Sequence, residues 1–298
     1  GEIKIELGND TESDDDDLTV YLGSDDSRQA NDLDWDATSI MLRGNYYFDN
    51  GHTLTFGYES DKLEIYNLFV QHAETSILFE SLEDFVAGTN AEIEYGYAYS
   101  GDLNDRAAEW GYTSHSTYAQ DEFYLTDDLK VVAGLRYDWI TTSDKPVENA
   151  EFLAQNNYSN TANLDGISLL QPRIGLNYTL SDDTELRGGI GLFSGGNPNV
   201  WISNAYSNDG VTNIGTRERQ INGFVSGTTS LFDLELTGQG RPIYDVPQEL
   251  FDVVANTSLT DGDGNTNATD PDFEIPSEWK YALGFTYVTE NDYLINAD

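Results

Sequence analysis

The chain has 298 residues, of which 54 are acidic and 14 are basic, so its formal net charge is −40. Too few cations are present to neutralise a row of phosphates, which excludes a nucleic-acid partner. The absence of cysteine excludes a disulfide scaffold, thiolate metal sites and thiol nucleophiles. The acidity has two interpretations: a solvated, salt-adapted surface, or acidic loops that bind divalent cations.

The first structural pattern lies between residues 40 and 58, after an acidic run at residues 14–17 that is expected to form a solvated loop tip. Apolar side chains alternate with polar ones on both sides of Asp49-Asn50-Gly51, namely Ile40, Leu42, Tyr46, Phe48, Leu54, Phe56 and Tyr58. A period of two predicts a β-strand, and the polar tripeptide predicts a tight reversal. This region is therefore expected to be a hairpin.

A short helix is expected between Ser81 and Gly88. Ser81 is followed three residues later by Asp84, which resembles a capping box, and Gly88 can end the helix.

The same alternation returns in four later segments, at residues 129–139, 170–180, 184–192 and 280–287. Their apolar faces carry Leu129, Val131, Leu135, Leu170, Ile174, Leu176, Leu186, Ile190, Leu192, Tyr281, Leu283 and Phe285. Strands of about 10 to 14 residues exceed the usual length of about 5 to 6 in soluble proteins. They match the roughly 9 to 11 residues of a tilted transmembrane strand.

The connections fall into two classes. Short polar turns occupy residues 49–51, 126–128, 181–183 and 290–292, whereas long polar stretches occupy residues 102–109, 142–165 and 195–276. Short turns on one rim and long loops on the other are typical of outer-membrane barrels.

The fold class predicted from these patterns is all-β: an antiparallel transmembrane β-barrel wall of about ten or eleven strands, part of a larger barrel. Residues 1–298 are expected to form one partial barrel domain, with short periplasmic turns and long extracellular loops, the longest at 195–277. The sequence contains no run of about 18 apolar residues, so no transmembrane helix is expected. The residues that follow Gly1 do not have the pattern of a signal peptide. Because the sequence stops within a predicted strand, it is expected to be an internal fragment. A large β-sandwich has the same periodicity and remains an alternative.

No constellation of residues predicts catalysis, so an enzyme is not expected. Gly189 and Gly191 mimic part of a dinucleotide-binding pattern, but the third glycine is missing and a bend in a strand explains them better. The histidines, His52, His72 and His115, lack metal-pair spacing. His115 lies between two serines in a predicted strand, where neighbouring side chains point to opposite faces.

Two groups of residues are candidates for binding. Calcium, the one cofactor considered, would bind in a loop through Asp261, Asp263, Asn265, Asn267 and Asp272, although the full calcium-loop pattern fails and a flexible polar loop is the alternative. An extracellular small ligand, peptide or glycan would contact Trp201, Asn204, Tyr206 and Asn208. The same aromatic and amide side chains could instead pack the loop onto the barrel mouth.

Several motifs resemble those of TonB-dependent receptors. YAQDEF at 118–123, followed by LKVVAGLRYDW at 129–139, resembles a barrel hairpin of that family, and QPRIGLNY at 171–178 resembles its next strand. Four segments are similar to the Oar-like (OmpA-related) subgroup of this family: LRGGIGLFSG (186–195), VWISNAYSN (200–208), NLFVQ (67–71) and DPDFEIPS (270–277). The resemblance extends from about residue 37 onward.

The resemblance implies a bacterial outer-membrane barrel of about 22 strands with an N-terminal plug. Its partners would be outer-membrane lipid, an extracellular ligand, and the TonB complex, which acts through the plug. No segment of this chain matches the plug or the closing C-terminal strands. The function implied is energised uptake of a scarce nutrient. The alternatives are a non-transporting adhesin or scaffold barrel and a secreted glycan-binding β-sandwich.

Overall fold

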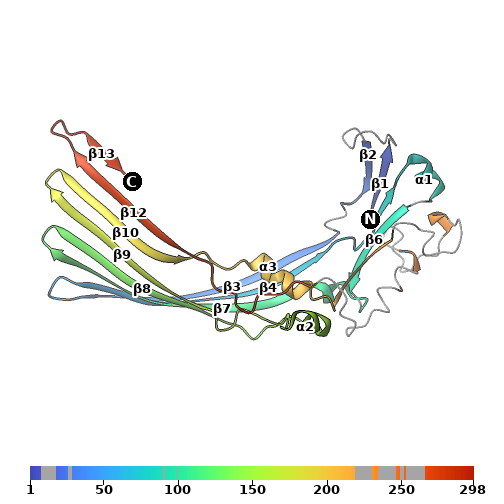
Figure 1. The fold of residues 1–298 in the computed structure, drawn as a ribbon, viewed down its shortest axis with the longest axis horizontal. Helices are drawn as coiled ribbons and strands as arrows, with labels where there is room; N and C mark the ends of the chain where they lie inside the picture. The colour runs from blue at the N-terminus through green and yellow to red at the C-terminus, as the bar shows by residue number, and fades with distance from the viewer. Residues whose placement is uncertain are drawn as a thin grey trace.

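The computed structural model describes residues 1–7, 18–25, 29–89, 91–98, 100–218, 230–233, 246–248, 252 and 266–298. Its larger sheet is antiparallel throughout and has eight strands, in the spatial order β13 (Leu294–Ala297), β12 (Ser277–Val288), β10 (Thr184–Ser194), β9 (Ser168–Ser181), β8 (Leu129–Thr141), β7 (Ala108–Thr126), β4 (Thr53–Val70) and β3 (Ala30–Tyr47). Figure 1 shows this sheet as a curved wall. Within the described residues its edge strands, β3 and β13, do not pair with each other, so the sheet is open.

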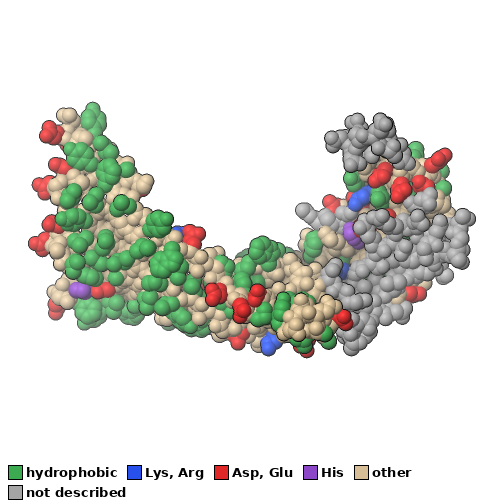
Figure 2. Space-filling model, viewed as in Figure 1, with side chains coloured by type: hydrophobic (Ala, Val, Ile, Leu, Met, Phe, Trp, Pro, Cys, Tyr) green, Lys and Arg blue, Asp and Glu red, His purple; other side chains and the backbone are tan. Residues whose placement is uncertain are grey.

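One face of the wall is apolar across its strands. Ile190 of β10 lies opposite Ile174 of β9 and Tyr281 of β12. Because opposed residues of antiparallel neighbours share a face, the alternating patterns of the separate strands merge into one surface. The hydrophobic side chains gathered over this part of the molecule are visible in Figure 2. Tyr281 is 82% exposed and Leu283 is 78% exposed.

This apolar face requires an apolar surrounding. Its exposed members include Leu42, Phe56, Leu135, Ile174, Leu176, Ile190, Tyr281 and Leu283. Burying each such side chain contributes about 1.5–3 kcal/mol, and an ordinary domain has a total stability of only about 5–15 kcal/mol. Leaving the face in water would cost as much as folding gains. The face is therefore covered by lipid, and the alternative of a water-soluble sandwich is wrong.

The predicted short turns are confirmed at one rim of the wall. The backbone amide of Phe48 donates to the carbonyl of His52 at 2.9 Å. At the same rim, the backbone amide of Val288 donates to the carbonyl of Asp183 at 2.8 Å. Gly51 adopts a left-handed conformation with a φ of 86°, which glycine tolerates without steric cost. The longer connections, residues 71–107, 142–167 and 195–276, all leave the opposite end of the wall, called here the long-loop end.

A second sheet of five strands lies beyond the long-loop end (Figure 1). Its order is β11 (Asn213–Glu218), β6 (Ala91–Ala98), β5 (Ser76–Phe79), β1 (Glu2–Leu7) and β2 (Leu18–Gly23), with β1 and β5 parallel and the other neighbours antiparallel. The strand count thus differs from the prediction. Where the sequence indicated about ten or eleven wall strands, the described wall has eight and a separate sheet holds five.

The helices are short: α1 (Leu82–Ala87), η2 (Leu103–Arg106), α2 (Ala150–Asn156), α3 (Asn199–Ser207) and η4 (Leu231–Asp233). The predicted helix after Ser81 is confirmed, because the Ser81 hydroxyl accepts from the Asp84 amide at 3.1 Å and Gly88 ends the helix at a φ of 69°. In the part of the chain that the structure describes, no helix is both long and apolar enough to cross a membrane.

Candidate functional site

At the long-loop end of the wall, α3 packs against β7. Trp110 near the start of β7 is 3% exposed, and its indole nitrogen donates to the Ser203 hydroxyl at 2.9 Å. The ring of Trp110 stacks on Tyr206 with centroids 5.3 Å apart. Ile202 completes this contact inside a small apolar cluster. The helix is therefore anchored to the strand by packing as well as by hydrogen bonds.

The four residues predicted to bind a ligand have different environments. Tyr206 donates its hydroxyl to the carbonyl of Asp144 at 2.9 Å. Asn208 and Asn267 are joined by an amide–amide hydrogen bond of 3.2 Å between their side chains. The carbonyl of Asn204 accepts from the backbone of Asn208, as expected at the end of a helix. Trp201 is 76% exposed. Tyr206 and Asn208 thus hold the loop in place, and Trp201 presents its ring to solvent.

Tyr206 has a pH signature. Burial, assisted by the charge of Asp144, raises the pKa of Tyr206 above its usual value of 10.0. At a pH between the usual tyrosine pKa and the raised pKa of Tyr206, the unfolded chain has lost the hydroxyl proton of Tyr206 while the folded chain keeps it. The free energy of unfolding therefore falls as the pH rises through the ordinary tyrosine range. We expect Tyr206→Phe to lower stability by about 1 kcal/mol at neutral pH, because one hydrogen bond is lost.

The alkaline loss of stability should be smaller in Tyr206→Phe than in the wild type. Urea unfolding followed by tryptophan fluorescence at neutral and alkaline pH checks both effects. Tyr158→Phe is the control, since its side chain lies in the loop at 142–167 and is 41% exposed. An identical alkaline slope in wild type and Tyr206→Phe would contradict the assignment.

A buried polar cluster, called here the polar clamp, consists of Asn149, Asn160 and Asp209, all at most 1% exposed. The amide of Asn149 donates to the Asn160 side chain at 2.8 Å, and the Asn149 side chain donates to the carbonyl of Asp209 at 3.0 Å. Asn149 also caps α2 by accepting from Phe152 at 3.0 Å. The clamp therefore connects the loop at 142–167 with the loop at 195–276.

Arg106 of η2 brings the third loop close to the same cluster. Burial lowers the pKa of Arg106 to about 10, and the charge of Asp209 acts in the opposite direction. A buried guanidinium is tolerated only where a charge or hydrogen bonds compensate its lost hydration. The polar clamp was not predicted from the sequence. Asn149, three residues before Phe152 at the start of a helix, was the one local signal for it.

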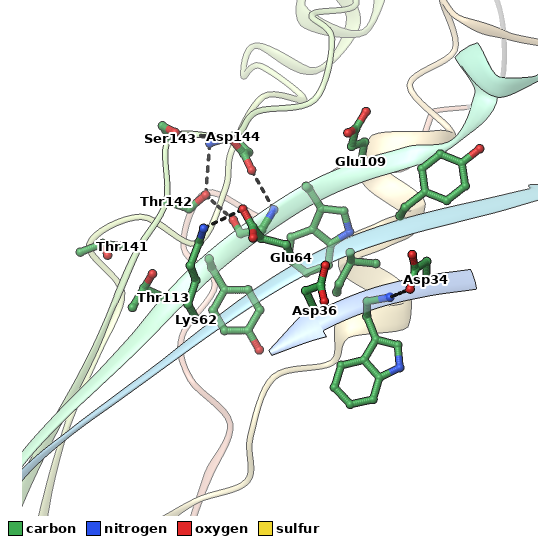
Figure 3. A pocket seen from close by; sticks show the side chains of 16 residues that line it. Asp34, Asp36, Lys62, Glu64, Glu109, Thr113, Thr141, Thr142, Ser143 and Asp144 are labelled. Carbon is green, nitrogen blue, oxygen red and sulfur yellow. Dashed lines mark hydrogen bonds and ion pairs between the residues drawn. The ribbon is translucent and has the colours of Figure 1, made fainter. Parts of the chain in front are cut away.

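An open groove of about 730 Å³ lies at the long-loop end of the wall (Figure 3). Lys62 and Glu64 of β4 alternate in phase with Tyr58, so they share its face. They form an ion pair of 2.7 Å. The groove is also lined by the carboxylates of Asp34, Asp36, Glu109 and Asp144. It suits hydrated or hydroxyl-rich groups better than apolar ones.

The proposed calcium ligands are only partly described. Asp261, Asp263 and Asn265 lie outside the described residues. The backbone of Asn267 donates to the carbonyl of Asn208 at 2.7 Å. Asp272 is exposed, and its backbone amide donates to Asp270 at 2.8 Å. No cluster of three or more metal-binding side chains occurs among the residues that the structure describes. Calcium binding stays a prediction.

His115 and Ser116 lie on opposite faces of β7. His115 contacts the Tyr58 hydroxyl at 2.8 Å and stacks on Trp139. Ser116 instead accepts a hydrogen bond from Arg136 at 2.5 Å on the other face. Each side chain is thus engaged with a different partner.

The open antiparallel wall, its lipid-covered face and its two unlike rims define an outer-membrane β-barrel protein. A family model described as outer membrane beta barrel domain matches residues 18–297, and the chain belongs to this family. It lies in the bacterial outer membrane with its apolar face against lipid, its short turns in the periplasm and its long loops outside. The face opposite the lipid is the lumenal face.

Among solved structures, the chain is similar to the copper transporter OprC, with 8% sequence identity and a TM-score of 0.40. The match covers 87% of this chain and 28% of the transporter. The comparison with curated proteins gives no match.

Proposed function

We propose that this barrel wall belongs to a TonB-dependent receptor of the Oar-like subgroup, which takes up a scarce nutrient across the outer membrane. The observation that carries the proposal is a charged, hydrogen-bonded lumenal face below a mouth at which the polar clamp joins two of the long loops. On that face Arg136 binds Glu59 at 2.8 Å and Asp138 at 2.7 Å. The motifs between residues 118 and 208 that resemble this receptor family support the same conclusion.

In this proposal the chain does no catalysis and holds no cofactor apart from calcium in an extracellular loop. The loops at the mouth capture the ligand, and Trp201 is the most exposed aromatic residue of α3. The polar clamp fixes Asn149, Asn160 and Asp209 before a ligand arrives, so less conformational entropy is lost at these positions when a ligand binds. A plug elsewhere in the receptor would be remodelled by TonB, which supplies the energy.

The proposal is tested with the full-length protein in detergent and the purified periplasmic domain of TonB. We expect the two to bind, and we expect deletion of the N-terminal plug to abolish binding while the barrel stays folded. Heat-modifiable migration on a gel reports whether the barrel is folded. A full-length protein that has no plug, or one that ignores TonB, would contradict the proposal and favour an adhesin or scaffold barrel.

A further inference from the structure

The basic side chains on the lumenal face are not all paired. The register places six of them there: Arg43, Lys130, Arg136, Arg173, Arg187 and Lys280. Four are ion-paired, namely Lys130 with Glu122, Arg136 with Glu59 and Asp138, Arg187 with Asp298, and Lys280 with Glu278. Within the described residues, Arg43 and Arg173 have no carboxylate partner.

This absence is informative because the chain has 54 acidic and only 14 basic residues. With so many carboxylates available, an arginine without one on a polar face is unexpected. The guanidinium of Arg173 lies 4.9 Å from the ring centroid of Phe193. Such stacking uses the face of the guanidinium and leaves its edge of N–H donors free for an anion.

Arg43 and Arg173 line the same lumenal cavity, which has a volume of about 250 Å³. The register explains how distant strands meet there. Arg43 of β3 lies opposite Gly57 of β4, Gly57 lies opposite Tyr118 of β7, and Tyr118 lies opposite Arg136 of β8. Arg136 borders the same cavity. This row across β3, β4, β7 and β8 thus brings the guanidinium groups of Arg43 and Arg136 to the cavity. The neighbouring row of opposed residues brings that of Arg173.

Glycines in these rows leave room for the cavity. A Cβ atom added at Gly57 would lie 2.5 Å from the Tyr118 hydroxyl oxygen and 2.7 Å from the Leu42 carbonyl oxygen. A Cβ atom at Gly134 would lie 3.4 Å from the side chain of Arg173. The missing side chains let Tyr118 lie across β4 and leave space beside Arg173.

The donors around this cavity suit carboxylates. Besides the arginines, Tyr118, Gln120 and Thr55 line it with a hydroxyl, an amide and a second hydroxyl. The planar fork of a guanidinium matches a carboxylate through two parallel hydrogen bonds. Because the net charge of −40 repels anions at a distance and charges are screened beyond about 10 Å, attraction of an anion must be local. Two unpaired arginines at one cavity meet that requirement.

We propose that this lumenal cavity binds the carboxylate groups of a small polycarboxylate solute, with Arg43 and Arg173 as its anchors. The inference rests on the proposed function, since a solute reaches the lumen only if the barrel takes one up. Binding itself is an equilibrium property that needs no TonB, so the two proposals can fail separately.

The experiment uses the full-length protein in nanodiscs of neutral lipid, with citrate as the probe and inorganic phosphate and sorbitol for comparison. Isothermal titration should show citrate binding to the wild type and none for sorbitol. Arg43→Gln and Arg173→Gln should each weaken citrate binding about tenfold or more, because charge-assisted hydrogen bonds are lost. The double variant should show no binding.

The matched control is Arg187→Gln, which removes the same charge from the same face but from an arginine already bound to Asp298 at 2.6 Å. It should leave citrate affinity unchanged, and heat-modifiable migration should verify that each variant folds. If Arg187→Gln weakened citrate binding as much as the other variants do, the total positive charge of the lumenal face would explain the binding, and the proposal would be overturned. Absence of citrate binding, or binding of phosphate alone, would overturn it too. Citrate binding only after deletion of the plug would show that a plug carboxylate occupies the cavity, which also overturns the proposal for a solute.

Discussion

Asp209→Ala is expected to release the loops at the extracellular mouth while the barrel wall stays folded. One carboxylate oxygen of Asp209 accepts from the amides of Val211 and Thr212, both at 2.7 Å, inside a cluster that is closed to solvent. Its charge also opposes the effect of burial on the pKa of Arg106. Removing one partner of a buried charged group typically costs about 3–5 kcal/mol.

Hydrogen–deuterium exchange on the full-length protein in detergent measures this effect. In Asp209→Ala, amides in the loops at 142–167 and 195–218 should exchange roughly 150-fold to 5,000-fold faster, which corresponds to about 3–5 kcal/mol. Strand amides of β8 and β9 should keep their protection. The control is Asp105→Ala, an exposed aspartate of the neighbouring connection at 71–107, for which about 0.5 kcal/mol or less is expected. Unchanged exchange in Asp209→Ala would mean that the clamp does not hold the loops.

Ile174→Lys is expected to destabilise the barrel by about 2–4 kcal/mol, because it places a charge in the middle of the lipid-facing surface. Ile174 lies opposite Ala133 and Ile190, and 43% of its surface is uncovered by protein. Lipid cannot hydrate an ammonium group there. Urea unfolding of the full-length protein in lipid vesicles, followed by tryptophan fluorescence, gives the change in free energy.

Asn177→Lys is the matched control on the other face of the same strand. Asn177 donates to Glu185 at 2.5 Å, and a lysine at this position can pair with the same carboxylate on the wet lumenal side. We expect little change in stability. If both substitutions cost the same, the assignment of the two faces to lipid and lumen would be wrong.

The assignment of these faces could be predicted from the sequence because it depends on a local rule. Side chains of a strand alternate between its faces, so Ile174 and Asn177 are on opposite sides whatever strand pairs with β9. Turn chemistry is local in the same way, and the reversal at Gly51 and the helix after Ser81 follow the predictions. The predicted short turns at 49–51, 126–128 and 181–183 join strands that pair as antiparallel hairpins.

The second sheet could not be predicted in this manner. β1 pairs in parallel with β5, from Glu2 opposite Ser76 to Ile5 opposite Phe79, across more than seventy residues of chain. β11 pairs with β6 across an even longer separation, from Asn213 opposite Ala98 to Glu218 opposite Ile93. Strands this short carry too few alternating positions to specify a partner. Their pairing depends on which loops meet above the barrel.

The candidate sites divide along the same line. Trp201 and Tyr206 were selected for their side-chain chemistry, and only the packing of α3 against β7 separates the exposed ring from the anchoring one. The unpaired state of Arg43 and Arg173 likewise depends on which carboxylates the register brings within reach.

By itself, the sequence determined an all-β chain with a lipid face, a wet face and two unlike rims, because alternation and turn residues act within a few positions. Only the tertiary structure decided the polar clamp, the second sheet and the lumenal arginine cavity. These features join residues that are distant along the chain, and their stability arises from burial and charge pairing that exist only after the strands have assembled.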